Sequence, residues 1–249
     1  MIVLVTGASS GFGAAIARKF VRHGHRVIAA ARRTERLAQL ATELGAQLLP
    51  VELDVTNKAS IKQMLETLPA DWQSIDVLVN NAGLALGLEP AHEAHLQDWE
   101  TMIATNCQGL VAMTRALLPQ MVARGSGLVI NISSIAGSYP YPGGNVYGAT
   151  KAFVDQFTLN LRADLVGTGV RATDIAPGIA GGTEFSNVRF KGDDAAAAKV
   201  YQGVQALTSE DIAEAAYWVT TLPAHVNINH LEMMPTCQGF SPLLIKRNA

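Results

Sequence analysis

The stretch IVLVTGASSGFG, residues 2–13, joins a short apolar run to three glycines arranged as G-x-x-x-G-x-G. Ile2–Thr6 predicts a buried strand, and the amphipathic pattern over Gly11–Arg22 predicts the helix that follows it. Gly7 permits a tight turn between the two elements, and Gly13 permits close packing of the helix. The free N–H groups at the start of such a helix attract phosphate, so this stretch predicts a nucleotide-binding βα unit.

The pattern of this first unit continues along the chain. Short runs rich in β-branched residues predict further strands, at residues 26–31, 48–54, 75–80, 128–132, 170–176 and 228–233. Helical periodicity predicts helices between them, at residues 34–44, 58–68, 98–124, 145–166 and 209–222. Because the strands are almost wholly apolar, they indicate a parallel sheet covered on both faces by helices. We therefore expect an α/β fold, a Rossmann-like doubly wound parallel sheet, in a single domain over residues 1–249.

Two features of the pattern point beyond a sheet with helices. Helical segments 110–123 and 149–166 are apolar on more than one face, so we expect a second face of each to meet another subunit. The helix that contains the first segment is expected to bend near Gly109 and Pro119. Residues 178–194 form the longest irregular stretch, which is typical of a lid or a binding loop.

Composition excludes several classes of protein. A hydrophobic content of 49% with a charged content of 16% excludes a disordered chain. The 19 basic and 21 acidic residues give a net charge of −2, so we expect neither a nucleic acid nor a membrane as partner. Cys107 and Cys237 are the only cysteines, and no leader precedes the first strand. We therefore expect a reducing compartment and a cytoplasmic protein.

The end of the second predicted strand selects between the two nicotinamide cofactors. NAD-binding folds carry an acid there for the ribose 2′-OH, whereas NADP-binding folds place a cation for the 2′-phosphate. This chain has Ala31-Arg32-Arg33 at that point. A guanidinium binds phosphate in a bidentate manner, so the sequence favours NADP, with Arg32 the stronger candidate of the two. The alternative is that both arginines are solvated at the start of a helix.

A tyrosine and a lysine stand four residues apart in Tyr147-Gly148-Ala149-Thr150-Lys151, which places both on one face of a predicted helix. Ser134 follows the strand over 128–132, at the carboxyl edge of the sheet where ligands bind. A free tyrosine has a pKa of about 10, too high for acid–base catalysis at neutral pH. A lysine cation roughly 4 Å away is expected to lower that pKa. The three side chains therefore predict an acid–base set for hydride transfer to or from a carbonyl.

The glycine turn, Asn80-Asn81-Ala82-Gly83, Ser134, Tyr147-x-x-x-Lys151 and Pro177-Gly178 stand in one order along the chain. In this ordered set the chain resembles the single-domain short-chain dehydrogenases/reductases, over essentially its whole length. The resemblance implies a Rossmann-like fold, a nicotinamide cofactor, hydride-transfer activity and a homotetramer.

The resemblance also implies roles for individual residues. Tyr147 would be the general acid in reduction and the base in oxidation, Lys151 would lower its pKa, and Ser134 would bind the substrate oxygen. Asn106 matches the helix asparagine that anchors a water relay to the lysine. The residues expected to bind the cofactor are Gly7, Ser9, Ser10, Gly11, Phe12, Gly13, Arg32, Arg33, Asp54, Val55, Asn81, Tyr147, Lys151, Pro177, Gly178, Ile179, Thr183 and Phe185.

Four longer stretches carry a closer resemblance, at residues 80–90, 143–153, 181–194 and 222–235. They are similar to the NADP-dependent 3-hydroxy acid dehydrogenases, a group that resembles serine and allo-threonine dehydrogenases and also reduces malonic semialdehyde. The implied reaction interconverts a short 3-hydroxy acid, such as serine, allo-threonine or 3-hydroxypropionate, and its 3-oxo acid. A substrate carboxylate needs a cation, and we expect Arg189 to supply it. The alternative is that Arg189 and Lys191 are both solvated.

Two other functions stay open on the sequence. One is a reductase of larger carbonyls, such as 3-oxoacyl thioesters or ketones. The other is a catalytically silent NADP sensor, against which the presence of Ser134, Tyr147 and Lys151 argues. No metal site is expected, because His92 and His95 have no third ligand beside them in the sequence.

Overall fold

The computed structural model describes residues 1–240, so the last nine residues of the expected domain lie outside the described part. Seven strands form one parallel sheet in the order β3-β2-β1-β4-β5-β6-β7. Their bounds are β1 Ile2–Thr6, β2 Arg26–Ala31, β3 Leu48–Glu52, β4 Val77–Asn80, β5 Gly127–Ile132, β6 Val170–Pro177 and β7 His230–Met233. The sheet confirms the predicted doubly wound α/β fold.

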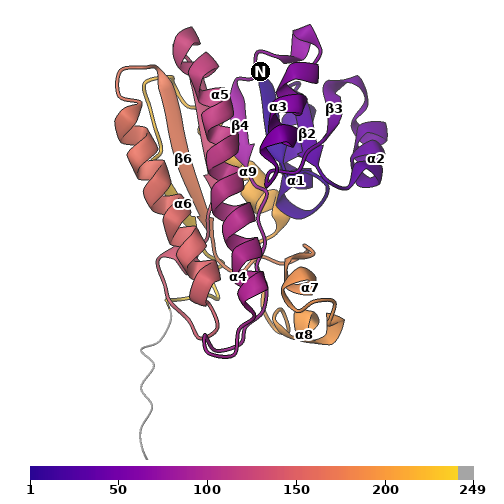
Figure 1. Cartoon of the computed structure of the whole chain (residues 1–249), viewed down its shortest axis with the longest axis vertical. Helices are drawn as coiled ribbons and strands as arrows, with labels where there is room; N and C mark the ends of the chain where they lie inside the picture. Colours follow the sequence, from indigo (N-terminus) through magenta and orange to yellow (C-terminus); the bar gives the residue numbers. More distant parts are fainter. Residues whose placement is uncertain (241–249) are drawn as a thin grey trace, which may run out of the picture.

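Helices cover both faces of the sheet, as Figure 1 shows. One face carries α1 (Gly11–Arg22), α2 (Thr34–Leu44) and α9 (Ser209–Thr221). The other carries α3 (Lys58–Thr67), α4 (Leu96–Ile103), α5 (Leu110–Arg124) and α6 (Asn145–Asp164). The short helices α7 (Phe185–Arg189) and α8 (Asp194–Lys199) pack on each other at one end of the sheet, below it in Figure 1.

The sheet separates two apolar cores, which explains why its strands are apolar without alternation. In β1, Val3 and Val5 are fully buried against α1, whereas Leu4 is fully buried against the helices of the opposite face. A strand that buries both of its faces needs apolar side chains at every position. The hydrophobic runs of the sequence therefore follow directly from the layered architecture.

The structure corrects the helix predicted over residues 98–124. The segment begins at Leu96 and consists of α4, a π-helical turn η3 (Ala104–Gly109) and α5. The bend expected near Gly109 therefore takes the form of this wider turn, whereas α5 continues through Pro119. Other boundaries differ by up to two residues, as where β3 ends at Glu52.

Two further sequence expectations concern surfaces. The α6 side chains Phe153 and Leu159 are 41% and 47% exposed, in keeping with the predicted second apolar face. The stretch expected to be irregular over 178–194 contains α7.

No helix within residues 1–240 is long and apolar enough to cross a membrane.

Candidate active site

A cavity of about 810 Å³ lies at the carboxyl ends of the strands, where β1 and β4 are neighbours but their following helices cover opposite faces. This change of direction is where open α/β sheets bind their ligands. The volume is in the range that holds a small molecule or cofactor. The predicted site residues that line the cavity are Gly7, Ser9, Ser10, Gly11, Phe12, Arg32, Arg33, Asp54, Val55, Asn81, Ser134, Tyr147, Lys151, Pro177, Gly178, Ile179, Thr183, Phe185 and Arg189.

The glycine turn has the form that a phosphate site requires. Gly7 and Gly11 have φ values of +67° and +52°, a region that side-chain-bearing residues rarely adopt. A Cβ at Gly13 would collide with the Gly7 carbonyl, so Gly13 supports the turn from behind the cavity. Asn81 Nδ2 donates to the Thr6 carbonyl at 2.9 Å, which ties β4 to the turn. The first N–H groups of α1 receive no side-chain cap from Ser10 and can bind a phosphate.

The second strand delivers Arg32 and Arg33 to the edge of the same cavity. Arg33 donates from Nε to Ser9 Oγ at 3.1 Å and from Nη2 to Ser10 Oγ at 2.6 Å. Its Nη1 forms an ion pair of 2.7 Å with Glu184. A guanidinium with two serine hydroxyls beside a glycine turn is a donor set suited to a phosphate monoester. Arg33 is thus one of the two predicted cations at this edge of the cavity, and its contacts with Ser9, Ser10 and Glu184 fix its position.

Tyr147 and Lys151 lie on the buried side of α6, each 7% exposed. Lys151 Nζ donates to the Ile132 carbonyl at 2.8 Å and lies 5.8 Å from the centre of the Tyr147 ring. Burial raises the pKa of Tyr147, although a hydrogen bond with Ser134 acts in the opposite direction. The expectation that the protein alone lowers this pKa is therefore wrong, because desolvation outweighs the charges around the phenol. In the protein alone, Tyr147 is a neutral phenol that can donate a proton.

The two consecutive serines after β5 have different surroundings. Ser134 Oγ lines the cavity, accepts from the Ala136 N–H at 3.1 Å and donates to the Pro177 carbonyl at 3.3 Å. Ser133 is 3% exposed and donates to Asp174 Oδ2 at 2.8 Å. Both serines line the cavity, but the Ser133 hydroxyl is engaged with buried Asp174, and Ser134 stays the serine predicted to bind the substrate oxygen.

Asn106 lies in the π-helical turn behind the cavity, 2% exposed. Its side chain accepts from the Leu84 N–H and donates to the Leu84 carbonyl, both at 2.9 Å. Nδ2 also lies 3.1 Å from Thr150 Oγ1, next to Lys151. Asn106 thus connects the loop after β4 to α6, the helix that carries Tyr147 and Lys151. Its position in the wider helical turn allows both contacts.

Helix α7 crosses the mouth of the cavity. The Phe185 ring lies 5.7 Å from the Tyr147 ring, centre to centre. Arg189 donates to Tyr141 Oη at 2.7 Å, and its guanidinium carbon lies 5.5 Å from the centre of the Tyr147 ring. Lys191 instead forms an ion pair with Asp98 at 2.8 Å. The structure thus separates the two cations of this segment and brings Arg189, not Lys191, to Tyr147.

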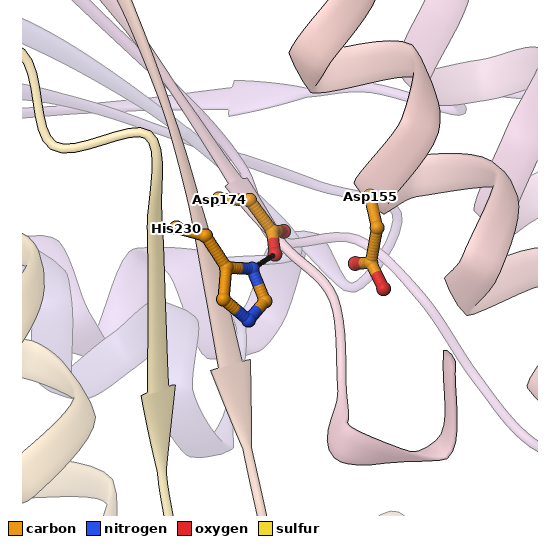
Figure 2. Close-up of side chains that lie close together, drawn as sticks. All are labelled: Asp155, Asp174 and His230. Carbon is orange, nitrogen blue, oxygen red and sulfur yellow. Dashed lines mark hydrogen bonds and ion pairs between the residues drawn. The ribbon is translucent and has the colours of Figure 1, made fainter. Parts of the chain in front are cut away.

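Three residues near the site were not predicted. Glu184 bridges Arg33 and Arg36, and Tyr141 is the partner of Arg189. Asp174 is 1% exposed and binds Ser133 and His230 (Figure 2). The signal in the sequence that could have drawn attention to Asp174 was an acidic residue in the middle of a predicted core strand.

Comparison with known proteins assigns the family. The model of the short chain dehydrogenase family matches residues 1–194. This chain belongs to the short-chain dehydrogenase family. It is 65% identical to the NADP-dependent 3-hydroxy acid dehydrogenase YdfG of Escherichia coli K12, over 99% of this chain and 100% of that protein. It is 49% identical to serine 3-dehydrogenase of Agrobacterium fabrum, over 99% and 98% of the two chains.

Solved structures agree with the sequence relatives. This short-chain dehydrogenase superposes with a TM-score of 0.99 on the closed form of a serine dehydrogenase complexed with NADP+. The two sequences are 65% identical, and the match covers 100% of each chain. The serine dehydrogenase from Escherichia coli superposes with a TM-score of 0.87, at 60% identity, over 96% of this chain and 100% of that one. The family and the fold inferred from the motifs are confirmed.

Proposed function

We propose that this short-chain dehydrogenase is an NADP-dependent oxidoreductase that interconverts short 3-hydroxy acids and their 3-oxo acids. The observation that carries this function is one cavity that is lined both by Arg33, hydrogen-bonded to Ser10 in the glycine turn, and by Ser134, Tyr147 and Lys151. Relatives at 65% identity over the full length are NADP-dependent 3-hydroxy acid dehydrogenases. The substrates proposed are serine, allo-threonine and 3-hydroxypropionate, with malonic semialdehyde in the reductive direction.

The residues of the cavity fit NADP. The proposed contacts are the pyrophosphate with the glycine turn and the start of α1, and the 2′-phosphate with Ser9, Arg32 and Arg33, all of which line the cavity. Asp54 and Val55 line the same cavity and are proposed to contact the adenine, and Thr183 lies beside Gly11. When bound, NADP+ accepts a hydride from the carbon that bears the substrate hydroxyl.

The protein supplies the proton chemistry of the reaction. In oxidation, Tyr147 accepts the proton of the substrate hydroxyl while Ser134 holds the same oxygen by a hydrogen bond. Because the pKa of Tyr147 is high in the protein alone, with Lys151 present, a further positive charge must favour the phenolate, and the oxidised nicotinamide ring would supply it. In reduction, the neutral phenol donates its proton to the alkoxide that forms.

Arg189 is the residue proposed to recognise the substrate carboxylate. It approaches Tyr147 from α7, and its guanidinium also donates to the Gly87 carbonyl at 3.2 Å. A charge-assisted hydrogen bond from this position would fix the hydroxyl of a short acid near Tyr147. The relatives support this substrate class over the larger carbonyls and over a silent sensor.

The assembly and the location are also part of this proposal. We expect one NADP-binding domain over residues 1–249, a homotetramer, and a cytoplasmic enzyme with neither a nucleic acid nor a membrane as partner. The exposed apolar side chains Phe153 and Leu159 on α6 support an association of subunits.

Initial rates with NADP+ and NAD+ test this function. L-Serine, L-allo-threonine and 3-hydroxypropionate should each be oxidised with NADP+ at a kcat/KM at least about tenfold above that with NAD+, because the 2′-phosphate adds charge-assisted hydrogen bonds. Uncharged alcohols of the same length are the control substrates. Oxidation of none of the acids, with NADP+ still bound, would overturn the substrate assignment.

A further inference from the structure

Lys151 is a buried cation whose direct hydrogen-bond partner is neutral. Its Nζ donates to the Ile132 carbonyl, and no carboxylate within residues 1–240 forms a salt bridge with it. Burial lowers the pKa of Lys151 to about 8. A charge in such a place is costly without a counter-charge nearby. The catalytic lysine therefore depends on negative charge that does not touch it.

Two carboxyl groups provide that charge. Asp155 lies one helical turn after Lys151 on α6, and Asp174 lies on β6, with both charges raising the pKa of Lys151. The other titratable groups that face the lysine are neutral at pH 7. Burial raises the pKa of the Cys107 thiol and that of Tyr147.

The two carboxyl groups are arranged as a pair. Oδ1 of Asp155 and Oδ1 of Asp174 are each buried with no hydrogen-bond partner. Ligand atoms of Asp155, Asp174 and His230 all lie within 4.8 Å of one another (Figure 2). The two side chains are within hydrogen-bonding reach of each other, and because ionised carboxylates can only accept, a hydrogen bond between them requires a proton on one of the two. One shared proton satisfies both oxygens and leaves the pair with one negative charge.

The other contacts of the pair fit this state. Asp174 Oδ2 accepts from Ser133 Oγ at 2.8 Å and from His230 Nδ1 at 2.7 Å, so only Oδ1 is left to face Asp155. Burial and the charge of Asp155 raise the pKa of Asp174 to about 7. Gly137, three residues after Ser134, has no Cβ, and a Cβ there would collide with Asp155 Oδ2. The fold thus makes room for the second carboxyl group.

We propose that Asp155 and Asp174 share one proton and together carry the single negative charge that keeps Lys151 protonated. They are positioning residues, since they act on the reaction through the lysine. The proposal rests on the role of Lys151 in the proposed function, which it extends to the charge behind the active site. Asparagine at either position would keep one carboxylate and supply an N–H in place of the shared proton. Asparagine at both positions would remove the charge.

Titration of the Lys151 side chain by heteronuclear NMR tests this proposal without any assay of activity. Asp155→Asn and Asp174→Asn should each leave the titration midpoint of Lys151 close to that of the wild type. The double variant should lower the midpoint by about one to two pH units, the effect of one charge at this range. Asp164→Asn, exposed at the end of the same helix, is the matched control. An unchanged midpoint in the double variant would overturn the proposal.

Kinetics supply the second measurement. With NADP+ and L-serine at pH 8, each single variant should stay within about twofold of the wild type in kcat, because Lys151 keeps its midpoint, whereas the double variant should lose about fivefold to fiftyfold, since a midpoint lower by one to two units leaves Lys151 largely neutral at that pH. A merely structural role would make the two losses multiply, so a double loss equal to the product of the single losses contradicts the shared charge. Denaturant unfolding of every variant shows that the fold is retained. If no hydroxy acid is oxidised at all, the proposed function fails while the NMR titration still decides this proposal.

Discussion

In the proposed function, Arg189 is the residue that recognises the substrate carboxylate. Arg189→Ala should raise KM for L-serine by about tenfold to a hundredfold, because it removes a charge-assisted hydrogen bond to the carboxylate. KM for an uncharged alcohol of similar size should change much less. The measurement is initial rates with both substrates at saturating NADP+.

Lys191→Ala is the matched control for this prediction. Lys191 lies two residues away in the same segment, but its ammonium pairs with Asp98 outside the cavity. Its removal should leave KM for both substrates within about twofold, as expected for a surface ion pair. Equal effects of Arg189→Ala on acid and alcohol would contradict the assigned role.

Asp174 makes the free energy of unfolding depend on pH, in a direction that follows from its pKa. The folded value of about 7 lies above the value of about 3.9 in an unfolded chain, so the folded state holds the proton more tightly. The stability that this group contributes is present below pH 4 and is lost as the pH rises to about 7. In urea unfolding, the free energy of unfolding of the wild type should fall between pH 4 and 7 by up to about 1.4 kcal/mol per pH unit more than that of Asp174→Asn.

The same unfolding series has a built-in comparison. Asp164 is exposed, so Asp164→Asn should reproduce the slope of the wild type between pH 4 and 7. A wild-type slope that also persists in Asp174→Asn would show that Asp174 is ionised throughout this range.

Among the elements, α7 is attached to the rest of the molecule at both of its ends. Glu184, at its start, pairs with Arg33 at 2.7 Å and with Arg36 at 2.8 Å. Arg189, at its end, donates to Tyr141 and to the Gly87 carbonyl. The helix thus lines the cavity between Arg33 and Tyr147, and the Glu184 contacts hold its first end.

Arg36 offers a test of that attachment, because it pairs with Glu184 without lining the cavity. Arg36→Gln should raise KM for NADP+ by about threefold to tenfold, since exposed ion pairs in a network contribute modestly. The difference from the wild type should shrink at high salt. Glu35→Gln, at the neighbouring exposed position, is the control. A wild-type KM in Arg36→Gln at low salt would show that the pair does not hold the helix.

Most elements were predictable from the sequence, and the exceptions have physical reasons. Apolar runs and helical periodicity located every strand and the long helices, because each buries a face against a fixed neighbour. The π-helical turn at Ala104–Gly109 was not predicted, since its apolar pattern is the same as that of an α-helix. What distinguishes it is the tertiary contact of Asn106 with Leu84, which sequence periodicity does not encode.

The site divides in the same manner. Residues that belong to local motifs, such as Tyr147 and Lys151, were found because their spacing along one helix fixes their relation. Glu184 and Asp155 were not found, since the role of each depends on a residue distant in the sequence. Glu184 pairs with Arg33, and Asp155 lies near Asp174. The shift in the pKa of Tyr147 was also predicted in the wrong direction, because the sequence shows the nearby lysine charge but not the burial of the phenol.

At the scale of the whole molecule, α6 has more apolar surface than one chain can bury. Phe153 stacks on Phe157 with ring centres 5.9 Å apart, and yet it is 41% exposed. If the proposed homotetramer uses this face, Phe153→Asp should shift the enzyme to smaller species, because it would place a charge in an apolar contact. Light scattering coupled to size-exclusion chromatography measures the mass.

The control for this shift is Ala38→Asp, on the exposed side of α2. It introduces the same charge on another helix and should leave the mass unchanged. A wild-type enzyme that is monomeric at micromolar concentration would contradict the proposed assembly outright.

The central claim is that Tyr147 moves the proton while NADP takes the hydride. Its most direct test is the rate of NADPH formation from L-serine by Tyr147→Phe, beside a titration of NADP+ binding to the same variant. We expect a loss in kcat of about 10²- to 10⁴-fold with NADP+ affinity changed less than threefold, since only the hydroxyl that exchanges the proton is removed. A variant that oxidises L-serine at the rate of the wild type would contradict it.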